Sequence, residues 1–345
     1  MSVIIKNQKL SISELLSGKI QENILSSSAS AALKFVTNWE NGQASFPIHS
    51  SGSTGKPKEI TLSREKIIYS AKSSMAFLDP NNQFKSALLC INPQYVGGMM
   101  VLVRALLHDL DLTVIDPATD ISDSINIFHY DLVSMVPMQV QHLLKTDPGL
   151  LVHFDTVLIG GAPLSNEDSA QLRNLNVRCF HTYGMTETAS HVALKNLSNG
   201  ESFFRTLGDV AIATDDRGCL KLKGTITDHN WIQTNDVVKV IAHDKFEWLG
   251  RADFVINSGG VKIHPEIVES LLSPQINVPF FISGIPDEHL GEKAVLFIET
   301  DQVPMINFEA LPAYHKPRTI ITVDQFEYTE SGKINRKATL KKIKL

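Results

Sequence analysis

Short apolar runs alternate with helical patterns through the middle of the chain, from about Lys85 to His191. The runs SALLCI, DLTVID, DLVSMV, DTVLIGG and VRCFHTYG are typical of buried strands, and helical segments such as GGMMVLVRALLHDL and PMQVQHLLK lie between them. This alternation predicts a parallel sheet covered by helices on both faces. Ligands of such sheets usually bind at the carboxyl ends of the strands. Two glycine-rich stretches fall at such ends, Gly160–Gly161 and Gly184.

The pattern changes after this section. The stretch DVAIATDDRGCLKLKG alternates on both sides of Asp216-Arg217-Gly218, which predicts a hairpin, and WIQTNDVVKVIAHDKFEWLG continues in short strands. Further along, Pro265 marks the start of a helix, and PFFISGI and KAVLFIE have the composition of strands.

We therefore expect an α/β fold with two domains. The first covers residues 1–249 and has parallel-type sheets flanked by helices plus a β-rich part. The second is a small C-terminal α+β domain over residues 250–345, with the boundary near Leu249–Arg251. A chain of 345 residues is long enough for two separate cores.

Composition and charge narrow the function classes. The formal net charge of -5 disfavours nucleic acid as a partner, because phosphate backbones are bound by basic surfaces. Three widely spaced cysteines offer no disulfide framework or zinc spacing, which suits a reducing compartment. The N-terminus lacks the pattern of a secretory signal, and the most apolar stretch, VGGMMVLVRALL, is too short for a membrane span and contains Arg104. We expect a cytoplasmic protein without a membrane or nucleic-acid partner.

One glycine-rich loop, HSSGSTGKPKEI, lies between the strand-like runs FPIH and EITL. It departs from the P-loop pattern, because Pro57 follows Lys56 where a serine or threonine is required. Glycines, hydroxyls and a lysine nevertheless suit the binding of a phosphate, since backbone N–H groups can surround an anion there. An ordinary polar hairpin would have the same composition, so the loop alone leaves both interpretations open.

Six motifs occur in a fixed order: SSGSTGKPK, GGAPL, YGMTET, TND, GRADFVINSGGVKIHPEIVE and SGKINRK. This set resembles the adenylate-forming superfamily of acyl-CoA synthetases, firefly luciferase and peptide-synthetase adenylation domains. The resemblance extends from about His49 to the C-terminus. It implies an enzyme that joins a carboxylate to AMP with release of pyrophosphate, after which a thiol displaces AMP. The implied substrates and cofactors are ATP, Mg²⁺ and coenzyme A.

The resemblance also implies roles for residues around the nucleotide. Tyr183 would stack on or near adenine, Asp236 would accept both ribose hydroxyls, and Arg251 would also bond the ribose. Asn235 departs from the usual Thr-Gly-Asp pattern. Core packing for Tyr183, a turn for Asp236 and a surface ion pair between Arg251 and Asp253 are the alternatives. The remaining nucleotide-binding residues are the phosphate loop Ser51, Gly52, Ser53, Thr54, Gly55 and Lys56, the adenine wall Gly161, Ala162 and Pro163, and Gly184.

For catalysis, the resemblance implies that Glu187 binds magnesium, that Thr186 bonds the α-phosphate and that Lys333 is the catalytic lysine. Lys333 also begins a basic tail, so a solvated terminal helix is the alternative for that residue. The small domain is expected to be mobile and to rotate between the two steps. Gly259 and Gly260 would then line a tunnel for the pantetheine thiol.

The short stretch before the phosphate loop implies an N-terminal domain truncated relative to typical members. The chain is in this respect most similar to compact o-succinylbenzoate–CoA ligases of menaquinone biosynthesis. Tyr95 and His181 are candidate residues of the acyl pocket, although a strand-end histidine satisfied by its neighbours is the alternative for His181. Other possibilities are a ligase for another aryl or short-chain acid, a stand-alone adenylation protein that loads a carrier-protein phosphopantetheine, and a nucleotide-binding protein without turnover.

Overall fold

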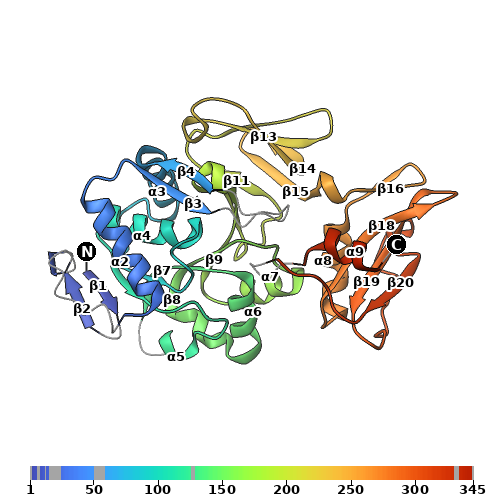
Figure 1. The fold of residues 1–345 in the computed structure, drawn as a ribbon, viewed down its shortest axis with the longest axis horizontal. Coiled ribbons are helices and arrows are strands. Elements are labelled where there is room, and N and C mark those ends of the chain that lie inside the picture. Colours follow the sequence, from blue (N-terminus) through green and yellow to red (C-terminus); the bar gives the residue numbers. More distant parts are fainter. Residues whose placement is uncertain are drawn as a thin grey trace.

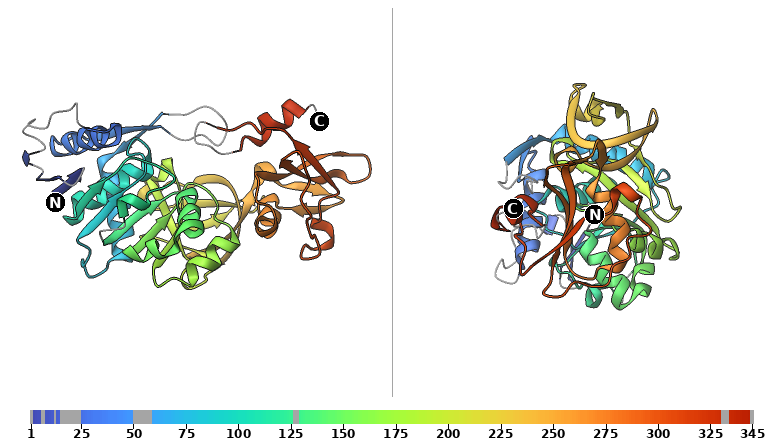
Figure 2. Two further views of the ribbon diagram at one scale, coloured as in Figure 1. Left: turned by 90° about the horizontal axis from the view of Figure 1, so that it is seen from below. Right: turned by 90° about the vertical axis from the view of Figure 1, so that its right-hand side faces the viewer.

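The structure is a computed structural model that describes residues 2–5, 8–11, 13–14, 25–49, 59–125, 129–329 and 334–343. The described residues form an elongated molecule with the two chain ends at opposite ends of its long axis (Figures 1 and 2). One large sheet with its covering helices forms most of the molecule, and a smaller sheet lies at the end near the C-terminus (Figure 1).

The large sheet has thirteen strands in the described part of the chain, and its centre is parallel. Neighbouring strands run in the order β9-β8-β7-β5-β6, and their parallel pairing confirms the prediction from the alternating pattern. Beyond β6, strand β1 pairs in parallel and β2 pairs antiparallel to β1. The bounds of these strands are β1 Ser2–Ile5, β2 Gln8–Ser11, β5 Ser86–Leu89, β6 Asp111–Val114, β7 Tyr130–Met135, β8 Phe154–Ile159 and β9 Arg178–Met185.

Helices cover both faces of this parallel centre. Successive strand residues point to opposite faces, so Leu89 packs in one core and Leu88 in the other. Helices α2 (Ser27–Glu40), α3 (Arg64–Leu78) and α4 (Val96–His108) cover the first face. The second is covered by α5 (Ser122–Ile125), α6 (Pro137–Thr146) and α7 (Asn166–Arg173). None of the helices in the described ranges combines the length and apolarity that crossing a bilayer requires.

The other half of the large sheet is antiparallel, and its outer strands β13 and β14 lie at the top of Figure 1. The predicted hairpin is present as β12 and β13, which pair around residues 215–218. The stretch WIQTNDVVKVIAHDKFEWLG, predicted as short strands, forms two strands, β14 and β15. The first is longer than expected, at eleven residues, and two register shifts interrupt its pairing with β15. The bounds are β10 Ser190–Asn196, β11 Phe204–Thr206, β12 Ala211–Thr214, β13 Cys219–Lys223, β14 Ile232–Ala242 and β15 Lys245–Arg251, and a separate ribbon is formed by β3 Ser45–His49 and β4 Glu59–Ser63.

The C-terminal region, defined here as residues 256–343, forms the smaller five-stranded sheet. The helix predicted at Pro265 and the strands predicted from PFFISGI and KAVLFIE are confirmed. Two small cores of its own, one of them containing Phe281 and Phe297, stabilise this region. Its elements are β16 Ile256–Ser258, β17 Val261–Ile263, α8 Pro265–Leu272, β18 Phe280–Asp287, β19 Gly291–Glu299, β20 Thr319–Val323 and α9 Arg336–Ile343.

Partly buried contacts hold the last helix to α8 and to the segment before the small sheet. Nη2 of Arg336, in α9, lies 2.7 Å from Oε2 of Glu269, in α8, and the guanidinium lies 4.6 Å from the centre of the Phe254 ring. On the other side, α8 touches the end of the large sheet, where the Arg251 backbone N–H donates to Glu266 Oε1 at 3.2 Å. Short 3-10 turns complete the fold at η2 Pro148–His153, η3 Thr186–Thr188, η4 Thr225–Thr227, η5 Ala252–Phe254, η6 Ser273–Gln275 and η7 Ala313–His315.

Candidate active site

The carboxyl ends of the parallel strands bring several predicted residues to one edge of the large sheet. Gly161, Ala162 and Pro163 follow β8, and Tyr183 and Gly184 lie near the end of β9. Tyr95 precedes α4 as its N-cap residue and is 44% exposed. The exposed apolar side chains of Val136 and Met138 follow β7 at the same edge. This edge therefore offers both glycine-rich backbone and apolar surface to a ligand.

Asp236 lies at the centre of a hydrogen-bonded group. The Tyr183 hydroxyl donates to its Oδ2 at 2.8 Å, and the indole Nε1 of Trp248 donates to its Oδ1 at 3.1 Å. Arg251 Nη1 lies 3.8 Å from the same Oδ1. Burial, together with the Asp236 charge, raises the pKa of Tyr183, so the phenol stays a protonated donor. The Asp236 carboxylate is only 13% exposed and is held from three sides.

Arg251 connects Asp236 to the segment leading into the C-terminal region. Its Nη2 lies 2.7 Å from Asp253 Oδ2, as in the ion pair considered as an alternative. Asn235, which replaces the expected glycine, donates from Nδ2 to Asp253 Oδ1 at 3.4 Å and accepts from Arg217 Nη1 at 3.3 Å. The unexpected side chain at 235 therefore bonds with groups on both sides without displacing Asp236.

The YGMTET motif bends from β9 into the short turn η3, which presents Thr186 and Glu187. Thr186 is half-buried, whereas Glu187 is exposed and has no hydrogen bond or ion pair with any residue that the structure describes. A glycine is required at position 184 because β10 passes close to it. A Cβ there would clash with the backbone of Ser190 and His191. The motif thus presents one exposed carboxylate that no described residue engages.

His181 lies on β9 beside the adenine-wall segment. Its Nε2 is 3.2 Å from the Ala162 carbonyl oxygen, and its buried Nδ1 has no partner among the described residues. Burial, with a contribution from the charge of Lys195, lowers the pKa of His181 to about 4. The ring is therefore neutral at pH 7 and offers no positive charge to an acid. The alternative for His181, a strand-end histidine satisfied by its neighbours, therefore agrees with the contact of Nε2 but not with the unpartnered Nδ1.

Two residues of interest were not identified from the sequence. Trp248 is the donor to Asp236 described above. Arg104 is only 1% exposed, and burial lowers its pKa to about 10. Its Nε donates to Ser74 Oγ at 2.9 Å, and its Nη2 lies 3.4 Å from His191 Nε2. No described carboxylate lies within ion-pair distance of it. The sequence did show an arginine within an otherwise apolar helix. Only the structure shows that this arginine is buried, which is rare for a charged side chain without an acidic partner.

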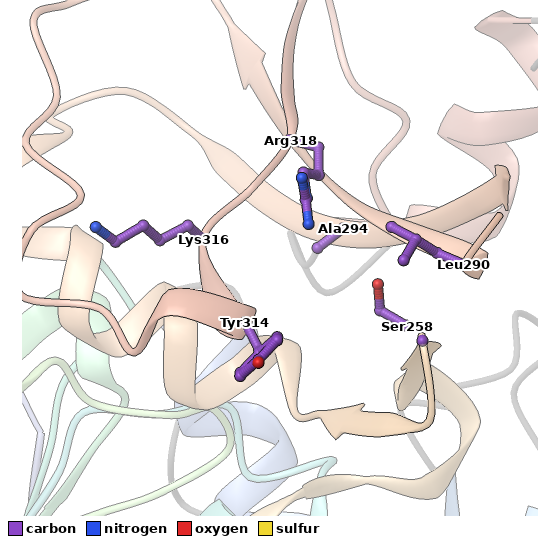
Figure 3. A pocket seen from close by; sticks show the side chains of 7 residues that line it. Ser258, Leu290, Ala294, Tyr314, Lys316 and Arg318 are labelled. Atoms are coloured by element: carbon purple, nitrogen blue, oxygen red, sulfur yellow. The ribbon is translucent and has the colours of Figure 1, made fainter.

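Gly259 and Gly260 form the turn between β16 and β17, with φ of 57° and 82°. These left-handed angles give a conformational reason for both glycines. Gly259 also lines a pocket of about 90 Å³ with Ser258, Leu290, Ala294, Tyr314, Lys316 and Arg318. The Arg318 guanidinium and the Ser258 hydroxyl point toward one another across it, and Lys316 extends outward (Figure 3). Neither cation forms an ion pair with a described residue.

Two predicted elements lie outside the described residues. They are the phosphate loop Ser51–Lys56 and the catalytic lysine Lys333. The described chain on either side of each is paired: His49 lies opposite Glu59 in the β3–β4 ribbon, and Tyr328 forms a bridge with Ile334.

Comparisons with known proteins assign the chain to a family. The family model described as AMP-binding enzyme matches residues 5–215. A 2-succinylbenzoate–CoA ligase of Listeria monocytogenes is 26% identical over 88% of this chain and 71% of its own length. The crystal structure of an acyl-CoA synthetase (AMP-forming)/AMP-acid ligase II-like protein from Dyadobacter fermentans is 34% identical, with a TM-score of 0.65 over 96% of this chain and 98% of that one.

The fold also matches a structure solved with a reaction intermediate. The o-succinylbenzoate CoA synthetase of Bacillus subtilis, in complex with the acyl-adenylate OSB-AMP, has a TM-score of 0.79 over 97% of this chain and 94% of that one, at 17% identity. At this identity the likeness concerns the fold, which confirms the predicted α/β architecture. Together with the family match, it shows that the chain belongs to the AMP-binding enzyme family.

Proposed function

We propose that this chain is an ATP-dependent acid–CoA ligase. In the first step, a carboxylate oxygen of the acid bonds to the α-phosphorus of ATP, and diphosphate leaves. In the second, the thiol sulfur of coenzyme A bonds to the acyl carbon, AMP leaves with the bonding electrons, and the thiol proton is released. The observation that carries the proposal is the grouping of Tyr183, Asp236 and Arg251, which come from three different strands.

The Asp236 group is suited to the ribose of ATP. A carboxylate accepts hydrogen bonds at both oxygens, and the two hydroxyls of ribose are donors at matching spacing. Arg251, beside the same carboxylate, supplies a charge-assisted donor. The backbone of Gly161, Ala162 and Pro163 and the ring of Tyr183 would then enclose the adenine, at the strand ends where nucleotides bind in related sheets. Gly184 would allow the chain to pass close to the nucleotide.

Glu187 fits the magnesium ion that the family implies. Mg²⁺ takes oxygen ligands and often uses only one or two protein carboxylates, with substrate phosphates completing the shell. The exposed Glu187 carboxylate, without partners among the described residues, meets this requirement. When bound, the ion would neutralise phosphate charge. Thr186, on the same turn, would donate its hydroxyl to the α-phosphate.

The remaining charge would be neutralised by the two elements outside the described residues. Ser51–Lys56 would hold the β- and γ-phosphates, and Lys333 would lie between the acid and the α-phosphate, where negative charge accumulates in the transition state. We assign the domains as residues 1–249 and 250–345. Rotation of the second domain would withdraw Lys333 after adenylation and bring Gly259 and Gly260 to the site.

The pocket beside Gly259 is suited to coenzyme A. Lys316 and Arg318 are cations without acidic partners in the described chain, and Tyr314 is a 72% exposed aromatic ring at the same pocket (Figure 3). Cations bind phosphate groups, and an exposed ring can stack on a base. Coenzyme A carries both groups at the end opposite to its thiol. The turn at Gly259 would direct the pantetheine arm toward the acyl-adenylate.

For the acid we propose o-succinylbenzoate, which the names of several relatives specify for those proteins. The negative charge of its second carboxylate would compensate the positive charge of a buried cation, and Arg104 is such a cation. Arg104 contacts His191, which pairs with Gly184 of the YGMTET motif, so the charge lies directly behind the candidate site. Tyr95, Val136 and Met138 would provide apolar surface for the aromatic ring.

The test is diphosphate release measured with purified protein, ATP and Mg²⁺ across a panel of acids, with and without coenzyme A. The panel contains o-succinylbenzoate, benzoate, which lacks the succinyl chain and its carboxylate, and short-chain acids. We expect release only with o-succinylbenzoate and formation of its thioester only when coenzyme A is added.

Other outcomes contradict specific parts of the proposal. Preference for benzoate or a short-chain acid would exclude the proposed substrate but keep the ligase activity. An adenylate that coenzyme A does not discharge, but a phosphopantetheine carrier does, would establish carrier loading instead. Absence of diphosphate release with every acid, from protein that binds ATP, would exclude a ligase.

A further inference from the structure

We infer that Trp248 is a positioning residue for nucleotide recognition, which orients Asp236 so that its carboxylate accepts the two ribose hydroxyls. The inference rests on the proposed function, because it takes the ribose of ATP as the ligand of Asp236. It adds a residue that none of the six motifs includes and whose proposed role acts through Asp236.

The local backbone explains how Trp248 reaches Asp236. Strands β14 and β15 are antiparallel, with Asp236 opposite Arg251 and Val238 opposite Trp248. An irregularity between Val237 and Val238 changes the register between these two pairs. A bulge of this kind turns a side chain away from the position that a regular ladder would give it. The indole of Trp248 therefore bonds to Asp236, two residues away from its own cross-strand partner.

Hydrogen-bond capacity shows what this contact achieves. A carboxylate has about four lone-pair positions, two on each oxygen. Trp248 Nε1 occupies one position on Oδ1, and the Tyr183 hydroxyl occupies one on Oδ2. Among the described residues no other donor reaches the carboxylate, so one position remains on each oxygen; Arg251 Nη1, at 3.8 Å, is beyond normal hydrogen-bond distance. Two neutral donors thus fix the rotation of the carboxylate, and the two open positions match two neighbouring hydroxyls.

The other tryptophans of the chain show that this contact is specific to Trp248. Trp39 packs against Phe35 and Phe46 in the core. Trp231 directly precedes β14 and is 47% exposed, with Lys221 Nζ at 5.6 Å from its ring centre. Trp231 makes no hydrogen bond to Asp236 in the structure, so it offers a matched control from the same part of the sheet.

The test is ribose discrimination in the variant Trp248→Phe, which removes the N–H and keeps an aromatic ring. Dissociation constants for ATP, 2′-deoxyATP and 3′-deoxyATP are measured by calorimetry. The preference for each ribose hydroxyl is the ratio of the dissociation constant of the corresponding deoxynucleotide to that of ATP. We expect at least one ratio to fall about fivefold or more, since a hydrogen bond to a charged group contributes about tenfold or more to an equilibrium constant. Trp231→Phe should leave both ratios unchanged.

A ratio separates orientation from general damage, because a merely structural loss weakens all three nucleotides equally. The decisive case is a wild-type protein that prefers ATP and an Asp236→Asn variant that has lost this preference. If the ratios of Trp248→Phe then equal those of the wild type, the inference is overturned but the proposed function is kept. A wild-type protein without preference for ATP would instead remove the assignment of ribose to Asp236. If the phenylalanine variant unfolds, replacement of Trp248 by benzothienylalanine removes only the N–H from a ring of the same shape, and the same two outcomes apply.

Discussion

The Asp236 group and the pocket of Lys316 and Arg318 differ in how they are built. At Asp236, donors from two strands, β9 and β15, hold one carboxylate that is 13% exposed. In the C-terminal pocket, two cations have no acidic partner in the described chain and lie beside an aromatic ring that is 72% exposed. The first arrangement is fixed before a ligand arrives, whereas the second leaves long side chains free to adjust.

This difference indicates two kinds of recognition. A fixed carboxylate selects by hydrogen-bond geometry, and removing it also leaves nearby donors without a partner. Unpaired surface cations attract anions of many shapes, and salt weakens that attraction. Binding at the proposed nucleotide site around Asp236 should therefore be sensitive to single atoms, and binding at the proposed coenzyme A pocket should be sensitive to ionic strength.

The largest effect is expected at the fixed end. Replacing Asp236 by asparagine keeps the shape but removes the charge beside Arg251. It also turns one acceptor into a donor, which then faces the donor of either Tyr183 or Trp248. We expect kcat/KM for ATP, measured by diphosphate exchange, to fall about 100-fold or more, which corresponds to about 3 kcal/mol. The matched control is Asp216→Asn at an exposed hairpin turn. Similar rates for the two variants would show that Asp236 takes no part in nucleotide binding.

An intermediate effect is expected in the C-terminal pocket. Changing Lys316 and Arg318 together to alanine should raise KM for coenzyme A about tenfold, because two phosphate-binding cations are lost, and should leave adenylate formation unchanged. In the wild-type protein, KM for coenzyme A should rise with salt, and the double variant should lose most of this dependence. Lys341, on the exposed side of α9, serves as the control position. An equal loss of adenylate formation would contradict the division of labour between the two regions.

The smallest effect concerns pH. The folded protein holds the pKa of His181 at about 4, below the ordinary value of 6.5, because burial disfavours the charged ring. The unfolded chain therefore binds a proton in the range between these values that the folded chain does not bind. The free energy of unfolding should fall as pH drops from 6.5 toward 4, by up to about 1.4 kcal/mol per pH unit from this group.

Urea unfolding at pH 7 and pH 5.5 measures this slope. His181→Asn should reduce the slope, and the same change at His243, whose side chain is 94% exposed, should not. If both variants retain the wild-type slope, His181 contributes nothing to the acid sensitivity.

Much of the fold could be predicted from the sequence because its signals are local. Strands β5 to β9 are short apolar runs, and Pro137 and Pro265 begin helices at the first turn, where a missing N–H costs nothing. The motifs also predicted Asp236 and Tyr183, and the structure joins them directly. The roles of Ser51–Lys56 and Lys333 remain predictions, since these residues lie outside the described ranges.

What could not be predicted depends on pairing and burial. The full length of β14 was missed because its register shifts disturb the alternation that identifies a strand. Trp248 lies twelve positions after Asp236, and only the same irregularity brings the two together. Arg104 was treated as a charge that argues against a membrane span, whereas the folded chain encloses it beside His191. Periodicity reports which face a residue occupies and not which partner it meets there.

The bond between Arg336 and Glu269 has a mechanical consequence. It anchors the final helix to the same body as α8, and the bridge from Tyr328 to Ile334 fastens the chain just before it. The described chain on both sides of residues 330–333 is thus attached to the same small sheet. In the rotation proposed above, both attachment points would move together with that sheet, so we expect adenylate formation to be unaltered when the polypeptide after Ile343 is lengthened or shortened.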